Sequence, residues 1–294
     1  MKSPGVPWPV LSCFALLMAA RCFGGEPKVL DASQVAREFT QRSWQHEHGL
    51  PAGDRIWAIL QTHDGYLWIG TQYGLARFDG RNFAVFDHVN TPELANDDCR
   101  TLAEDLEGNL WIGTEARLIR KTKNRFTSFE SQLGAEARSR PPLCASRSGG
   151  VWVGGITGIY HVRGDDVKLY PQNKSQPLGP GLVACLAETE PGFVWVGTKT
   201  GFGRLDVSTG QFENFSTNTP FESLYTFSML GTTNGGLWIQ FLEQEAQKGN
   251  WNPMSWLAWL EPGKRPQLPS PIARWLAKGA FVLADSEGSL WLAG

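Results

Sequence analysis

The sequence predicts an all-β fold, on the strength of its composition and of an internal repeat. Glycine supplies 33 of the 294 residues and charged side chains only 19%, whereas long helices need far more Ala, Glu, Lys and Leu and much less Gly. Apolar residues make up 41%, which is enough to bury a sizeable core and argues against disorder. The formal net charge of −2 leaves no excess of Lys and Arg to neutralise phosphates, so no nucleic-acid partner is expected.

Six copies of a Gly-x-x-Trp pattern make up the internal repeat. Successive tryptophans are 41 to 43 residues apart, except for a last interval of 53. Four of the copies carry another glycine two residues after the tryptophan. Matches at one offset in six places indicate one structural unit that recurs along the chain. The repeated residues are Gly65 and Trp68, Gly108 and Trp111, Gly149 and Trp152, Gly192 and Trp195, Gly235 and Trp238, and Gly288 and Trp291.

Each repeat unit contains about four short strands. Asp64-Gly65 is a tight hairpin signal, because glycine reaches the positive φ of a primed turn. Four strands in about 40 to 45 residues are typical of a β-propeller, so we expect about six four-stranded blades, the last incomplete. In that architecture the repeated Trp and Gly are scaffold, the tryptophan facing one neighbouring blade and the following glycine leaving room for packing. The strands expected in the first unit are Ile56–Thr62, Tyr66–Thr71, Leu75–Phe78 and Phe83–Phe86.

The first unit resembles the two-component regulator propeller repeat. The resemblance depends on GYLWIGTQYGLARFDGRNFAVF at 65–86 and on the stretch 42–51 before it, and it covers about residues 39–294. It implies a ring of seven blades in the periplasmic sensor region of a bacterial signalling protein. It also implies partners within one full-length chain: a second propeller, a β-sandwich, a membrane helix and a cytoplasmic output such as a histidine kinase. The full-length form that it implies is a homodimer anchored in the inner membrane.

The N-terminus reads as an export signal. Lys2 gives a positive start, Val10–Ala20 is an apolar core too short to span a bilayer, and the small residues Gly24 and Gly25 follow. Residues 1–25 are therefore expected to be a signal peptide that directs the chain to the periplasm.

The remaining chain divides into two segments by sequence pattern. Residues 26–53 lead into the first repeat, and Phe39–Trp44 within them is expected to supply a ring-closing outer strand. Residues 54–294 hold the repeats and stop within the sixth blade, so we expect the sequence to be a fragment with an exposed sheet edge.

No catalytic motif is present in the sequence: GxSxG, HExxH and GxxxxGK[ST] are all missing. His46-Glu47-His48 offers two imidazoles without a third ligand, so no metal site and no cofactor are expected. Cys99, Cys144 and Cys185, which follow the signal segment, contain no CxxC pair and read as buried free thiols. This portion of the protein is therefore expected to be non-catalytic, while the full-length chain could carry a kinase.

Ligand residues are expected in the loops between the second and third strands of the blades. These loops lie on the same face of a propeller as the crossings between blades, where ligands usually bind. The fifth unit has extra sequence there, Phe241–Ser255, in which an aromatic stands beside amide and acid groups, as suits a sugar ring. That insertion could equally be decorative or pack on another domain. The candidates for binding a small molecule or glycan are Gln72, Tyr73, Glu115, Thr157, Lys199, Asn250 and Trp251.

The leading functional hypothesis is an extracytoplasmic ligand-sensing propeller of a bacterial two-component system. One alternative is an exported lyase or hydrolase of the streptogramin-lyase type, which should show a convergent His/Glu set at the channel. The histidines follow no repeat offset, which argues against it; they are His46, His48, His63, His88 and His161. A cell-surface interaction scaffold is a further alternative that the residues leave open.

Overall fold

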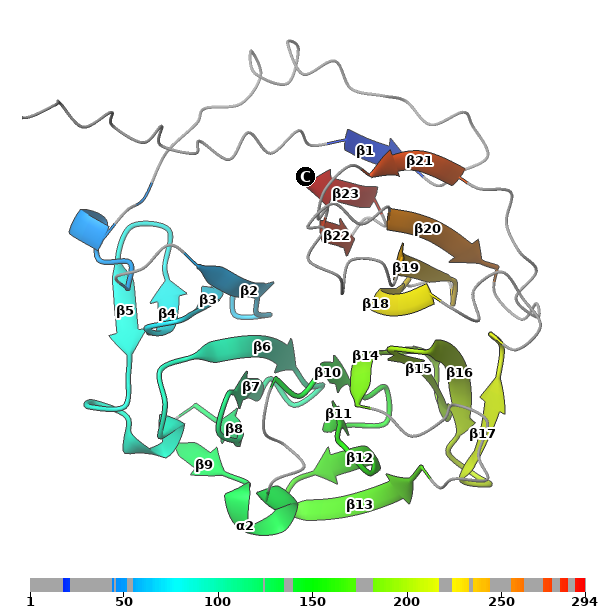
Figure 1. Ribbon diagram of the computed structural model, residues 1–294. Coiled ribbons are helices and arrows are strands. Elements are labelled where there is room, and N and C mark those ends of the chain that lie inside the picture. Colours follow the sequence, from blue (N-terminus) through cyan, green and yellow to red (C-terminus); the bar gives the residue numbers. More distant parts are fainter. Residues whose placement is uncertain are drawn as a thin grey trace, which may run out of the picture.

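The protein is a ring of small antiparallel sheets, shown down its axis in Figure 1. The computed structural model describes residues 18–21, 44, 46–51, 55–123, 125–134, 140–172, 182–216, 224–232, 235–243, 255–261, 272–276, 281–284 and 289–293. Five sheets of four strands follow one another, each with its strands in sequence order. The first strand of each sheet lies nearest the centre and contacts the first strand of the next. The predicted all-β propeller is thereby confirmed.

The elements recur with the repeat. The first sheet is β2 (Ile56–Gln61), β3 (Leu67–Thr71), β4 (Gly74–Phe78) and β5 (Phe83–Phe86). The second is β6 (Cys99–Glu104), β7 (Leu110–Thr114), β8 (Leu118–Lys121) and β9 (Phe126–Ser128). The third is β10 (Leu143–Ala145), β11 (Val151–Gly154), β12 (Gly158–Arg163) and β13 (Asp166–Pro171). The fourth is β14 (Val183–Glu190), β15 (Phe193–Thr198), β16 (Gly201–Asp206) and β17 (Gln211–Asn214). The fifth is β18 (Leu224–Gly231), β19 (Leu237–Glu243), β20 (Ser255–Leu260) and β21 (Ile272–Leu276). Short helices are η1 (His46–His48), η2 (Pro92–Leu94) and α2 (Glu130–Leu133).

The sixth repeat forms a three-stranded sheet in the order β1, β23, β22. Strands β22 (Phe281–Ala284) and β23 (Ser289–Ala293) form its repeat-derived hairpin, and β1 (Met18–Arg21) pairs antiparallel with β23. Strand β1 thus comes from within the predicted signal peptide. Of the predicted closing strand, residues 39–43 lie outside the described residues. Trp44 is described and is not in a strand; its ring lies 5.2 Å from that of Phe78.

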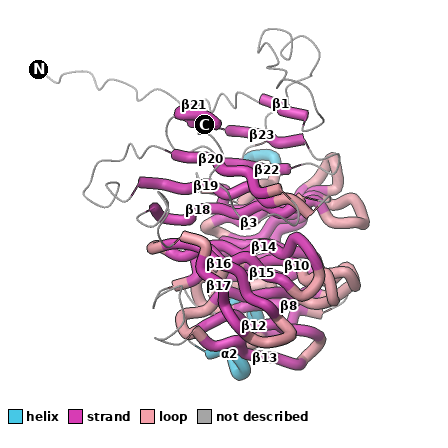
Figure 2. Tube along the Cα trace, turned by 90° about the vertical axis from the view of Figure 1, so that its right-hand side faces the viewer, coloured by secondary structure: helices cyan, strands magenta, loops and turns pink. Residues whose placement is uncertain are grey.

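The strands of the first unit agree with the prediction to within one residue at each end. In the five described hairpin turns the repeated glycine adopts positive φ, from 76° at Gly108 to 98° at Gly149. Seen edge-on in Figure 2, the strands run across the thickness of the ring, so their turns gather on two faces. We call the face with the second-to-third-strand turns (72–73, 115–117, 155–157 and 199–200) the crossing face. The opposite, hairpin face carries the first-to-second-strand turns (62–66, 105–109, 146–150 and 191–192).

The core lies between neighbouring sheets and is built on the repeated tryptophans. Trp111, which is fully buried, packs with Val151 and Val153 of the next sheet, and the other clusters follow the same rule. The glycine two residues later permits this close approach. A Cβ at Gly70 would lie 2.6 Å from the Cys99 carbonyl oxygen of the next sheet, which real Cβ atoms essentially never do. The repeated Trp and Gly therefore have distinct packing roles: the tryptophan fills the space between neighbouring sheets, and the glycine allows those sheets to approach closely.

The first sheet has exposed apolar side chains on the side that faces away from the second. Ile59 on β2 is 54% exposed, whereas the equivalent residues Leu186 and Met229 are 6% and 7% exposed. Figure 1 shows the ring open between the first sheet and the β1–β23–β22 sheet. Within the part of the chain that the structure describes, none of the helices has the length and apolar character needed to cross a membrane.

Candidate ligand site at the crossing face

Four first strands share a β-bulge at the same position, eleven residues before the repeated tryptophan. In the first sheet Ile56 stands opposite Thr71 and Ala58 opposite Gly70, so Trp57 between them has no cross-strand partner. Bulges bend a strand and re-aim a side chain, and they are common next to functional sites. Here they lie at the crossing-face end of the strands nearest the ring axis. The bulged residues are Trp57, Arg100, Ala184 and Phe227.

Arginines surround the Trp57 ring. The guanidinium carbon of Arg100, the bulged residue of the second sheet, lies 4.4 Å from the ring centroid. Those of Arg55 and Arg140 lie 5.7 Å and 5.6 Å from it. Such distances allow cation–π attraction, worth about 0.5–2 kcal/mol depending on desolvation. Segments that begin the first three sheets thus converge on one indole.

Two carboxylates complete the arrangement. Asp98 Oδ2 accepts a hydrogen bond from Arg100 Nη2. Glu115, in the β7–β8 turn, places Oε2 3.2 Å from Arg100 Nε and 4.0 Å from Arg140 Nε. The Arg100 side chain is only 12% exposed, and Asp98 15%. We call this set the Trp57 cluster: Arg55, Trp57, Asp98, Arg100, Glu115 and Arg140.

Several buried polar atoms of the Trp57 cluster have no hydrogen-bond partner among the described residues. They are Trp57 Nε1, Asp98 Oδ1 and Arg100 Nη1. Leaving a buried donor or acceptor unsatisfied costs about 1–3 kcal/mol, and more for charged groups. Polar groups kept in this condition are a reason to look for a ligand that supplies the partners.

The cluster extends toward the fifth sheet through Arg140. Burial raises the pKa of the Tyr225 phenol on β18, with a smaller contribution from Cys185, and the positive charge of Arg140 opposes that shift. The Tyr225 ring meets the bulged Phe227 edge-on, with centroids 6.0 Å apart. Arg140 itself has a φ of 70°, in the left-handed region that side chains other than Gly, Asn and Asp rarely adopt.

The predicted ligand residues are spread around the crossing face. Gln72 and Tyr73 lie in the β3–β4 turn, Thr157 in the β11–β12 turn and Lys199 in the β15–β16 turn. Tyr73 is 52% exposed, and Thr157 Oγ1 is 3.2 Å from the Tyr160 hydroxyl. Of the predicted set, only Glu115 belongs to the Trp57 cluster. Asn250 and Trp251 lie outside the described residues.

The sequence prediction missed Trp57 and the arginines. A signal was present, because the residue eleven positions before the repeated tryptophan changes in type from unit to unit. It is Trp57, Arg100, Pro141, Ala184 and Phe227 in the first five units. Variation at a fixed structural position suggests that the residue there serves something other than the repeat.

On the hairpin face, several polar groups pair between sheets. Glu188 Oε2 accepts hydrogen bonds from the Arg147 backbone N–H at 2.7 Å and from Trp152 Nε1 at 2.9 Å, both in the preceding sheet. Glu104, at the same repeat position, accepts the backbone N–H of His63 at 3.0 Å. These glutamates latch the third sheet to the fourth and the first to the second.

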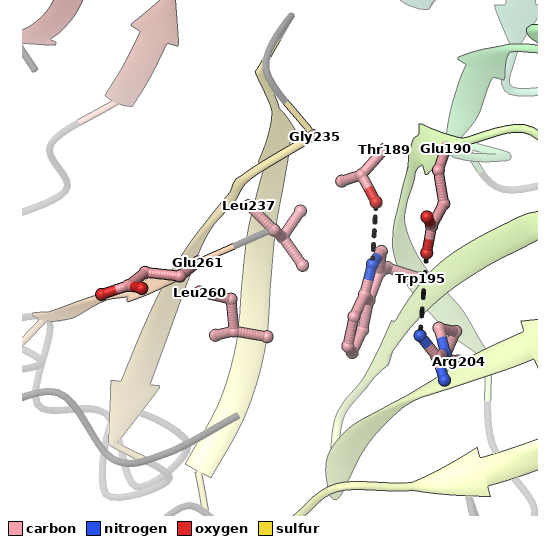
Figure 3. A pocket seen from close by; sticks show the side chains of 8 residues that line it. All are labelled: Thr189, Glu190, Trp195, Arg204, Gly235, Leu237, Leu260 and Glu261. Carbon is pink, nitrogen blue, oxygen red and sulfur yellow. Dashed lines mark hydrogen bonds and ion pairs between the residues drawn. The ribbon is translucent and has the colours of Figure 1, made fainter. Parts of the chain in front are cut away.

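A small pocket lies where that latch is missing, between the fourth and fifth sheets (Figure 3). Gly231 occupies the repeat position of Glu104 and Glu188. Within the pocket Glu190 and Arg204 form an ion pair of 3.9 Å. Its lining residues are Thr189, Glu190, Trp195, Arg204, Gly235, Leu237, Leu260 and Glu261. Among the described residues, no three His, Cys, Asp or Glu side chains come together as metal ligands would.

The fold and the Trp57 cluster define a β-propeller with a polar, aromatic candidate site beside its axis. Residues 49–73 match the family model described as two component regulator propeller. This match confirms the resemblance seen in the first repeat. No curated protein sequence matches the chain.

Solved structures share the fold at low sequence identity. PorZ, a surface component of the type-IX secretion system of Porphyromonas gingivalis, matches with a TM-score of 0.59 and 14% identity, over 81% of this chain and 38% of that one. The extracellular domain of BT4673 from B. thetaiotaomicron, described as a one component system, matches with a TM-score of 0.50 and 19% identity, over 81% and 37%. YCF48 bound to D1 peptide matches with a TM-score of 0.53 and 16% identity, over 81% and 74%. The chain thus spans only 36 to 40% of the length of the first structures it matches.

Proposed function

We propose that this chain is the extracytoplasmic ligand-sensing propeller of a bacterial two-component signalling protein. The family match at residues 49–73 supports the signalling context. The export signal expected in residues 1–25 supports the location. The observation that carries ligand binding is the Trp57 cluster, with buried polar atoms that lack partners at the crossing face.

The ligand that this cluster suits is a small polar molecule or glycan. An indole face supplies a flat apolar surface for a sugar ring, and convergent charged groups supply hydrogen bonds that fix its orientation. The function is binding and not catalysis.

Binding would act on the geometry between sheets. The cluster joins residues of three neighbouring sheets, so a ligand that bridges them favours one relative arrangement and shifts the population toward it. In the full-length protein this shift would pass through further propeller and β-sandwich domains to a cytoplasmic output, within a homodimer held in the inner membrane. A histidine kinase is the output that the family resemblance implies.

The test is a ligand screen on the 294-residue chain by thermal shift, with a panel of neutral and acidic methyl glycosides as probes. Trp57→Ala is the variant. Tyr66→Ala is its control, because Arg77 lies 4.4 Å from the Tyr66 ring on the hairpin face, the same stacking as in the cluster. We expect at least one glycoside to raise the melting temperature of the native chain and of Tyr66→Ala, and not that of Trp57→Ala. A panel with no stabilising member, or equal stabilisation of Trp57→Ala, would overturn the proposed binding.

Export is tested separately. The chain expressed with a C-terminal tag in a Gram-negative host should be recovered from the periplasmic fraction. Retention in the cytoplasm would overturn the extracytoplasmic assignment.

A further inference from the structure

We infer that the Trp57 cluster selects a carboxylate-bearing sugar, a uronate, over the corresponding neutral sugar. This inference depends on the proposed function and names the class of ligand for the same site. It comes from the charge balance and the fixed position of the arginines around the indole.

The cluster holds more positive than negative charge. Three guanidinium groups lie within 5.7 Å of the Trp57 ring centroid. The two carboxylates, Asp98 and Glu115, are both directed at Arg100. No carboxylate among the described residues forms an ion pair with Arg55, and Arg140 has only the distant Glu115 contact of 4.0 Å. The balance leaves about one positive charge, which a single carboxylate would neutralise.

The arginines have distinct places in the site. Arg100 is 12% exposed, and its contacts with Asp98 and Glu115 hold its guanidinium against the indole of Trp57. Arg140, 59% exposed, reaches solvent beside the same ring. A ligand that stacks on Trp57 would therefore meet the Arg140 guanidinium at its edge.

Arg140 is held in position by the chain that follows it. Pro141 comes next, and its carbonyl oxygen accepts a hydrogen bond of 2.8 Å from Thr101 Oγ1 of the second sheet. The Pro141 ring and carbonyl also lie against Gly113, where a Cβ would come within 3.1 Å and 3.3 Å of them. The φ of 70° at Arg140 is thus accompanied by tight packing of the next residue, Pro141, against the second sheet. Strained backbone of this kind persists where surrounding structure over-determines it and clusters at ligand sites.

The chemistry favours a carboxylate on a ring. A guanidinium presents paired N–H donors that match the two oxygens of a carboxylate, and the bond is charge-assisted. A phosphate monoester carries a charge of about −1.5 to −2 at neutral pH, which exceeds the surplus of the cluster. A neutral sugar would stack equally well on Trp57 but would leave Arg140 with only its 4.0 Å contact to Glu115.

Isothermal titration calorimetry on the 294-residue chain tests this selection. The probes are the methyl glycosides of glucuronic, galacturonic and mannuronic acid, each paired with its neutral hexose. The variant is Arg140→Ala, and the control is Arg77→Ala, which removes an arginine stacked on an aromatic of the hairpin face. We expect one uronate to bind at least tenfold more tightly than its neutral partner, in the native chain and in Arg77→Ala. In Arg140→Ala that preference should fall to less than threefold.

The outcomes separate the two proposals. Neutral hexoses that bind as tightly as uronates, with binding lost in Trp57→Ala, would overturn the uronate selection and leave the sensor function standing. A uronate preference that survives Arg140→Ala unchanged would also overturn the selection as argued here. Binding of no probe in either class would overturn both. Because the contact is charged and partly exposed, the preference should also weaken as salt rises from 50 mM to 500 mM, in contrast to the stacking contribution.

Discussion

Replacing Trp111 with phenylalanine should destabilise the protein more than the same replacement at Trp195. The two tryptophans hold equivalent positions in the second and fourth sheets, and both are buried, with exposures of 0% and 6%. Their hydrogen-bond acceptors differ. Trp111 Nε1 donates to the carboxylate of Asp105 at 2.7 Å, and Asp105 is 2% exposed. Trp195 Nε1 donates to the hydroxyl of Thr189 at 3.2 Å.

The expected difference follows from the acceptor. A hydrogen bond to a charged group contributes about 1.5–3 kcal/mol net, and one between neutral groups about 0.5–1.5 kcal/mol. Asp105 keeps its bonds from the backbone N–H groups of Glu107 and Asn109 and from Asn109 Nδ2, so its charge is not left bare. The free energy lost with the Trp111 hydrogen bond should therefore lie near the lower end of the 1.5–3 kcal/mol range, at about 1.5 kcal/mol. Both variants lose the same indole bulk, so the free energies of unfolding should differ by about 1 kcal/mol.

Urea unfolding followed by circular dichroism measures this difference, provided that the slope with denaturant is the same for both variants. A double-mutant cycle with Asp105→Asn isolates the pair, and we expect a coupling of about 1 kcal/mol between Trp111 and Asp105. Equal losses for the two phenylalanine variants, or a coupling near zero, would refute the argument that the acceptor charge decides the contribution of the repeated indole.

Two pairs of substitutions and one thiol-labelling experiment further test the packing between sheets. Glu188→Ala should lower the free energy of unfolding by about 2 kcal/mol, because it leaves the buried Trp152 Nε1 and the half-buried Arg147 backbone N–H without an acceptor, whereas Glu104→Ala, whose donors face solvent, should cost about 1 kcal/mol; equal losses in urea unfolding would contradict the latch. Gly113→Ala, whose Cβ would lie 2.2 Å from a hydroxyl oxygen, should cost about 3 kcal/mol, and Gly65→Ala, with φ of 87° and open space around it, about 1 kcal/mol; the reverse order of melting temperatures would rule this out. Burial, together with the negative charges of Asp97 and Asp98, raises the pKa of the fully buried Cys99 thiol from 9.0 to about 12, so at pH 8 a disulfide reagent should label it only as fast as the protein unfolds. Because that pKa is raised in the folded state, the stabilisation is complete below pH 9 and is lost between pH 9 and about 12; labelling faster than unfolding, or stability that rises across this window, would disprove the burial effect.

The repeat made the fold predictable because each unit solves the same packing problem. The indole of Trp68 fills the space before the next sheet, and Gly70 admits the next first strand. The same residue types recur wherever that geometry recurs. One pattern found six times therefore specifies strands, turns and faces together. The bulge one residue into β2 is not visible in this pattern, because a bulge depends on register between two strands and not on composition.

The candidate site was harder to predict for a related reason. Its residues occupy repeat positions where the units differ, so a search for matches discards them. Trp57 and Arg100 hold equivalent positions on the first strands of neighbouring sheets. The arrangement of the sheets in a ring brings the Arg100 guanidinium carbon to 4.4 Å from the centroid of the Trp57 indole. The turns between second and third strands contribute only Glu115 to the Trp57 cluster, whereas Arg55, Asp98 and Arg140 lie in the segments that lead into the first strands.

The polar groups on the two faces of the propeller differ in how they are hydrogen-bonded. On the hairpin face, Glu188 Oε2 accepts hydrogen bonds from the neighbouring sheet, which fixes one sheet against the next, although Glu188 Oε1 has no partner among the described residues. On the crossing face, Asp98 and Arg100 are buried yet keep atoms without partners, which costs stability that the fold does not recover by itself. A ligand that satisfies those atoms would recover it, and would do so only while the three sheets hold the geometry that brings the atoms together. Binding energy and sheet arrangement are then linked by the same contacts, which is the physical requirement for a propeller to report a ligand to another domain.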